Sequence, residues 1–144
     1  MSIKRFIAAC LLSLPLSAHA ALVIQNWQTS EGARVVFVES HELPILDISV
    51  NFPAGSARDP AGKAGLAHLT HGLLDQGAGG ITDTTIAHRL ADVGAVLSGS
   101  FDRDRAEVGL RTLSSASEKS AAIDILTRVL QRPDFPQAVI KREK

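Results

Sequence analysis

Two histidines and an aspartate stand at helical spacing in the segment from Gly65 to Gly77. At 100° per residue, His68, His71 and Asp75 lie within about 60° of one another on a helix. Neutral imidazoles and a carboxylate are suitable ligands for zinc, so these side chains form a candidate metal site. The alternative is a solvated polar helix face with ordinary surface histidines, because two histidines three residues apart are a common accident.

The leucines of the same segment lie on the other side of the helix. Leu66, Leu69, Leu73 and Leu74 fall at i, i+3, i+7 and i+8, which indicates one apolar face. We expect this face to pack on a sheet, so that the imidazoles and the carboxylate point away from the sheet. The glycine-rich stretch that begins at residue 77 is expected to end the helix.

Five other segments have the composition and alternation of strands. The turn-forming cluster 30–32 joins the first two, and the continuous apolar run 35–38 suggests a strand covered on both faces. Trp27 is expected to anchor an edge of the core. A loop rich in proline and glycine, residues 53–62, follows the third strand. The expected strands span residues 22–28, 33–39, 45–52, 96–101 and 106–113.

Three further helices are expected. One begins at Asp83 or Thr84, either of which is a good N-cap, and stops at Gly94. Another begins at Ser115 and Glu118, which have the spacing of a capping box, and carries an apolar stripe over residues 121–130. A last helix starts near residue 136. The order β-β-β-α-α-β-β-α-α predicts an α+β fold, with a mostly antiparallel sheet and helices packed on one face.

Residues 1–20 have the pattern of a secretory signal peptide. Two basic residues precede an apolar run that is too short for a membrane-spanning helix, which needs about 20 residues. Ala18 to Ala20 is a suitable cleavage site, which predicts that residues 21–144 are periplasmic or secreted. A buried N-terminal helix and lipidation of Cys10 are the alternatives.

The composition narrows the class of protein. The chain has 144 residues, 15 basic and 15 acidic side chains and 45% hydrophobic residues, which suits a globular domain rather than a nucleic-acid binder driven by a basic surface. Its single cysteine leaves with the signal peptide, so a disulfide scaffold is excluded. We expect no membrane span in residues 21–144.

The run Gly65–His68 followed by Leu73 and Leu74 resembles the insulinase/pitrilysin family of zinc metallopeptidases. The resemblance covers nearly all of residues 21–144, and it implies the N-terminal part of a longer peptidase domain, so we expect the chain to be a fragment. Further weak matches follow in the family's order: a first core strand at 32–38, the loop before the metal helix at 54–59, a helix end at 90–95, and the start of the next helix at 135–136 with 142–143.

The family's active site is an inverted H-x-x-E-H, in which two histidines bind zinc and the glutamate is the general base. The resemblance places His68 at the first ligand, His71 at the base and Gly72 at the second ligand. The family's third ligand falls about seven residues beyond Glu143, past the end of this chain. Glu143 itself matches a nearby acidic position. One ligand of three is thus present and no catalytic residue is identified.

Three hypotheses follow from the resemblance. The first, which we favour, is an inactive subunit that holds a peptide at a sheet edge and partners an active zinc peptidase in a hetero-oligomer. The second is an active zinc metalloendopeptidase with an altered site of His68, His71 and Asp75. The third is a non-proteolytic periplasmic scaffold. Stoichiometric zinc bound through His68 and His71 would support the active peptidase. Co-purification with a partner that has an intact H-x-x-E-H motif would favour the inactive subunit over the scaffold.

Overall fold

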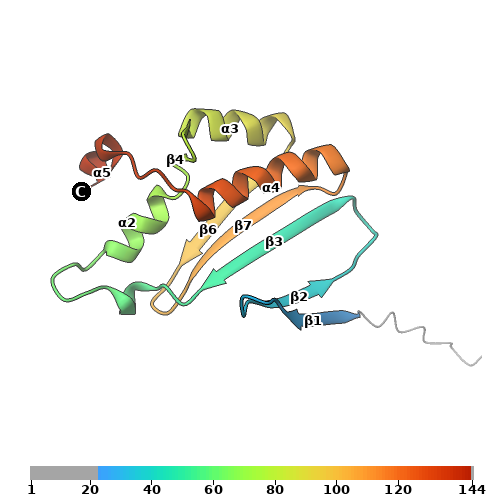
Figure 1. Ribbon diagram of the computed structural model, residues 1–144, viewed down its shortest axis with the longest axis horizontal. Coiled ribbons are helices and arrows are strands. Elements are labelled where there is room, and N and C mark those ends of the chain that lie inside the picture. Colours follow the sequence, from blue (N-terminus) through green and yellow to red (C-terminus); the bar gives the residue numbers. More distant parts are fainter. Residues whose placement is uncertain (1–22, 144) are drawn as a thin grey trace, which may run out of the picture. The chain divides into compact units, whose positions relative to one another are not determined.

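The computed structural model describes residues 23–143, which form two compact units on either side of Glu42. The expected signal peptide lies outside the described residues. The first unit holds β1 (Ile24–Gln28) and β2 (Arg34–Val38). Figure 1 shows the elements of the second unit, which are β3 (Ile45–Phe52), η1 (Ser56–Arg58), α2 (Leu66–Leu73), β4 (Gly77–Ala78), β5 (Ile81–Thr82), α3 (Asp83–Asp92), β6 (Val96–Phe101), β7 (Ala106–Leu113), α4 (Ala116–Gln131) and α5 (Gln137–Glu143).

The first unit is an antiparallel hairpin, as expected. Its turn is closed by the backbone N–H of Thr29, which donates to the carbonyl of Ala33 at 2.9 Å. Gly32 adopts a φ of +86°, a left-handed conformation that favours glycine. Taken by itself, the hairpin leaves Val36 70% exposed and Trp27 49% exposed. Two strands alone are too few to cover each other's faces.

The second unit is built on a three-stranded sheet of order β3-β7-β6 with both pairs antiparallel. Side chains alternate between its two faces. One face is polar, and on it the Arg111 guanidinium donates to Asp47 at 2.7 Å and Ser49 donates to Glu107 at 2.8 Å. The other face carries Leu110 of the central strand, which is 2% exposed.

Helices α3 and α4 lie on the same side of this sheet (Figure 1). They bury the apolar face of β7, so the predicted α+β fold with helices on one face is confirmed. The core residues that α3 and α4 contribute are Ile86, Leu90, Ala122, Ile125, Leu126 and Val129.

Helix starts and stops differ in detail from expectation. Ser115 is the N-cap residue of α4, as expected, but its hydroxyl donates to the Glu118 carboxylate and makes no capping hydrogen bond, so the expected capping box is not formed. Thr82 caps α3, because its hydroxyl accepts the N–H of Thr85 at 3.2 Å, so the choice of Asp83 or Thr84 is wrong by one or two residues. Gly77 does not only end a helix: it begins β4, which pairs with β5 around two left-handed glycines.

No helix within residues 23–143 is both long enough and apolar enough to cross a membrane.

Candidate functional site

The start of α2 is fixed by a carboxylate from the loop before it. Asp59 accepts the backbone N–H of Gly65 at 2.8 Å and that of Ala67 at 2.9 Å. The first N–H groups of a helix have no partner inside the helix, and the helix dipole favours a negative charge there. The Arg58–Asp59 pair of the loop therefore has a structural use in this chain, because Asp59 holds the N-terminus of α2.

The same loop is bound to the turn between β6 and β7. The N–H of Ser56 donates to the carbonyl of Asp102 at 3.0 Å, and that of Ala57 donates to Arg103 at 2.8 Å. Gly55 allows this approach, because a Cβ there would lie 2.3 Å from the Arg103 carbonyl carbon. The backbone of the loop thus ties the start of α2 to one end of the sheet.

His71 faces the sheet rather than solvent. Its Nε2 lies 3.2 Å from the carbonyl oxygen of Glu107 on β7, which gives a hydrogen bond if Nε2 carries the proton. On β6, a Cβ at Gly99 would lie 2.6 Å from the same nitrogen. The expectation that both imidazoles point away from the sheet is therefore wrong, because the absent side chain of Gly99 leaves room for His71.

The leucines of α2 are spread over more than one environment. Leu73 is buried and Leu74 packs against the core, whereas Leu66 is 42% exposed. Leu69 and Leu73 line a cavity with Glu143 of α5. Helix α5 packs beside α2, which explains why the apolar stripe of α2 does not face the sheet alone. The periodicity of the α2 sequence could not predict that α5 would lie there.

His68 and His71 meet at one aromatic ring. The centroid of Phe101 on β6 lies 5.0 Å from that of His68 and 5.8 Å from that of His71. Asp75 accepts a hydrogen bond from the neighbouring Gln76 at 3.0 Å. Among residues 23–143 no three histidine, cysteine, aspartate or glutamate side chains are grouped so as to hold a metal ion.

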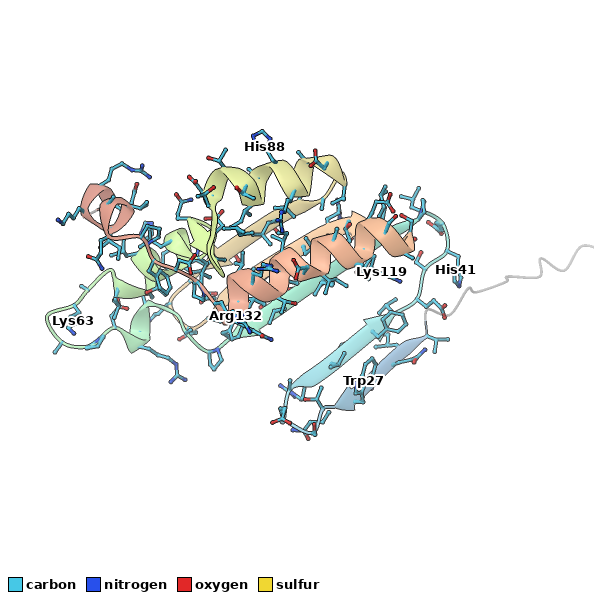
Figure 2. All side chains as sticks on the ribbon, turned by 45° about the horizontal axis from the view of Figure 1, so that its top comes forward. Trp27, His41, Lys63, His88, Lys119 and Arg132 are labelled. Carbon is cyan, nitrogen blue, oxygen red and sulfur yellow. The ribbon has the colours of Figure 1, made fainter. Side chains whose placement is uncertain are left out.

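The remaining histidines of the described residues belong to other parts of the chain. His88 is exposed on α3 and points outward (Figure 2). His41 lies in the first unit beside Glu39, with its Nε2 3.2 Å from the carboxylate.

Gly72 stands between two cavities. One has a volume of about 280 Å³ and lies between α2 and β6, and the other has about 170 Å³ and lies towards α5. Both are lined by Gly72, and a Cβ at this position would meet no atom within 4 Å. The position that matches the family's second zinc ligand is thus open space.

The outer edge of β6 borders the first cavity. Within the described residues β6 pairs with β7 alone. The N–H of Asp102 donates to Arg105 at 2.9 Å, and hydrogen-bonded and non-hydrogen-bonded pairs alternate from that point along an antiparallel ladder. The backbone groups of Leu97, Gly99 and Phe101 therefore face outward from the sheet, where an extended chain can bind them.

A family model and one solved structure indicate the same family, and a second solved structure shares the fold. The sequence model described as "Insulinase (Peptidase family M16)" matches residues 34–144. A crystal structure of a peptidase M16 inactive domain from Pseudomonas fluorescens is 35% identical, with a TM-score of 0.81, over 85% of this chain and 29% of that one. A protease from Helicobacter pylori shares the fold, with 17% identity and a TM-score of 0.69 over 82% of this chain and 28% of its own.

A search of curated proteins found no match. The chain spans less than a third of the length of both solved structures, so it corresponds to one part of such a protein.

Proposed function

This chain belongs to the insulinase family, peptidase family M16, and on that premise we propose that it is a non-catalytic member that holds an extended peptide. The observation that carries the proposal is Gly72, which lines two cavities where the family places its second zinc-binding histidine. Similarity to an inactive domain of this family supports it.

The donor set at α2 does not fit the family's zinc ion. Gly72 has no donor atom, and the Nε2 of His71 is already 3.2 Å from the carbonyl of Glu107. This leaves His68 as the single side chain that matches a family ligand, whereas catalytic zinc sites use three protein ligands. An imidazole at position 71 also replaces the carboxylate that would take a proton from a metal-bound water. The alternative zinc site of His68, His71 and Asp75 is disfavoured on the same grounds.

Peptide holding is supported by the free edge of β6. Three residues present outward N–H and C=O groups, and an added strand would use these groups for main-chain hydrogen bonds. The cavity between α2 and β6 gives room for side chains of that strand. Because main-chain bonds supply the affinity, the site would accept many sequences in extended form.

An active zinc peptidase is the partner we propose, in a hetero-oligomer that encloses the peptide. This chain is similar to less than a third of each solved relative, so a complete chamber requires more protein than residues 23–143. We also propose export to the periplasm or the medium after cleavage behind Ala20. N-terminal sequencing of protein recovered from the periplasmic fraction tests this, and a mature chain that begins at Met1 would refute it.

The peptide proposal is tested with a fluorescein-labelled heptapeptide of alternating threonine and valine. We expect saturable binding that is weakened by N-methylation at alternate backbone positions, because strand addition bonds every second N–H. We also expect the protein alone to leave the peptide uncut, with or without added zinc. Hydrolysis that is abolished by a chelator and by His68→Ala would instead establish the active-peptidase hypothesis. A complete lack of binding would favour the scaffold hypothesis.

A further inference from the structure

We propose that the space beside Gly72 is a side-chain pocket for a lysine or arginine of the bound peptide. This inference rests on the proposed function, because it assumes that a peptide lies along β6. It gives that site a preference for a basic side chain. Because glycine stands at position 72, where the family has a histidine, there is room for a side chain of the peptide.

Strand geometry selects which peptide residue enters the pocket. The backbone of Gly99 faces outward, so an added antiparallel strand would place one residue in a hydrogen-bonded pair with it. Side chains of directly paired residues lie on the same face of a sheet. The face at Gly99 is the one covered by α2, because His71 lies directly over it. The peptide side chain paired with Gly99 therefore points to the α2 side, where Gly72 opens the cavity.

The walls of the two cavities match a long side chain with an apolar stem. Leu97 and Val108 of the sheet line the first cavity, and Leu69 and Leu73 of α2 line the second. Lysine and arginine bury their methylene stems on such surfaces while the charged head stays near water.

The polar lining of the cavities favours a cationic head group. Asp75 and Gln76 line the cavity at β6, and Glu143 lines the one at α5. Among residues 23–143 neither cavity is lined by a lysine or an arginine, although His71 lines the first and His68 the second. Glu143 is already paired with the Arg142 guanidinium at 2.9 Å, so Asp75 is the carboxylate that carries the preference. Arginine offers five N–H donors, so one head group can bond a carboxylate and the Gln76 amide oxygen together.

Gly72 lies within the last turn of α2, where glycine is unfavourable by about 1 kcal/mol relative to alanine. Nothing in the packing requires it, because a Cβ would meet no atom within 4 Å. Glycine at position 72 therefore costs helix stability without relieving a steric clash. A pocket that needs the empty space beside it would explain why glycine stands there. Substitution at this position therefore changes the pocket without disturbing the fold.

The experiment uses the threonine–valine host peptide with the central residue varied among glycine, norleucine, arginine and glutamate. We expect arginine to bind about tenfold more tightly than glycine, with norleucine between them and glutamate no better than glycine. Gly72→Leu should remove the advantage that arginine and norleucine have over glycine. Asp75→Asn should narrow the gap between arginine and norleucine.

Ala87→Leu on α3 is the matched control, because it adds the same side chain at an exposed helical position outside both cavities. It should leave all four affinities unchanged. The inference is overturned if all four peptides bind equally well, or if Gly72→Leu weakens the binding of none of them. In both cases alternate N-methylation must still weaken binding, which shows that the peptides bind by strand addition. Absence of binding by every peptide would overturn the proposed function as well.

Discussion

At the scale of single residues, His71 and Gly99 form a matched pair. The imidazole occupies the space that a side chain on β6 would fill, and its Nε2 lies 3.2 Å from the Glu107 carbonyl. At position 71 the family has a catalytic glutamate. In this chain the His71 imidazole stands there instead and packs α2 on the sheet. The pair is the residue-level reason for the orientation of α2 that periodicity alone did not predict.

Gly99→Ala is expected to destabilise the protein by about 1–3 kcal/mol, because the new Cβ would overlap the imidazole. In a His71→Ala background the same change should cost at least 1 kcal/mol less, since the obstructing ring is gone. The free energies of urea unfolding of the four proteins in this double-mutant cycle measure the coupling. Additive effects would show that His71 does not lie over Gly99.

At the scale of elements, α2 depends on groups outside itself. It has eight residues, and an isolated helix of that length is marginal in water. Asp59 bonds two of its first N–H groups, and the loop that carries Asp59 is held by the turn between β6 and β7. The position of His68 and His71 over β6 therefore depends on a chain of contacts that begins in the loop.

Asp59→Ala should cost about 1 kcal/mol of stability, because two N–H groups at the helix start lose their acceptor. The loss should be concentrated in α2, so amide hydrogens of this helix should exchange faster while those of α4 are little changed. Hydrogen-exchange mass spectrometry measures both helices in one experiment. Asp59→Asn, which keeps one acceptor oxygen, is the control and should lose less. Equal protection of α2 in all three proteins would contradict the capping role.

The cross-strand pair of Asp47 and Arg111 gives the sheet a dependence on acid. The hydrogen bond from Arg111 holds the pKa of the Asp47 carboxyl below its ordinary value. A carboxyl with a lowered folded-state pKa stabilises the protein above its unfolded pKa of about 3.9, and this contribution is lost as the pH falls through the folded value.

Asp47→Asn should therefore flatten the loss of stability as the pH falls below about 4, which denaturant unfolding at a series of pH values measures. Arg111→Met should flatten it similarly, because the carboxyl then loses the partner that lowers its pKa. The double variant should show no further change. An acid dependence that is unchanged from the wild type in both single variants would show that the pair does not form.

At the scale of the whole molecule, the sequence predicted the family and most of the fold. Alternation in residues 45–52 and 106–113 and the apolar stripe of α4 each reflect contacts with one sheet, so local pattern was sufficient. The side of α2 that meets the sheet was predicted wrongly, because it depends on Gly99 and α5, which lie far from α2 in the sequence. The short strands β4 and β5 were missed because two residues are too few to show alternation.

On the proposed function, Gly72 removes the family's metal site while the rest of α2 keeps its place. Zinc content after dialysis against micromolar zinc, for the wild type and for Gly72→His, tests it most directly. A Cβ at position 72 would meet no atom within 4 Å, and a histidine there would stand one turn from His68, the spacing of two zinc ligands on one helix face. We predict far less than one zinc per wild-type chain and a higher, substoichiometric content in Gly72→His, because His68 and the new histidine supply two of the three ligands that such a site uses. One zinc per wild-type chain, lost in His68→Ala, would contradict the account.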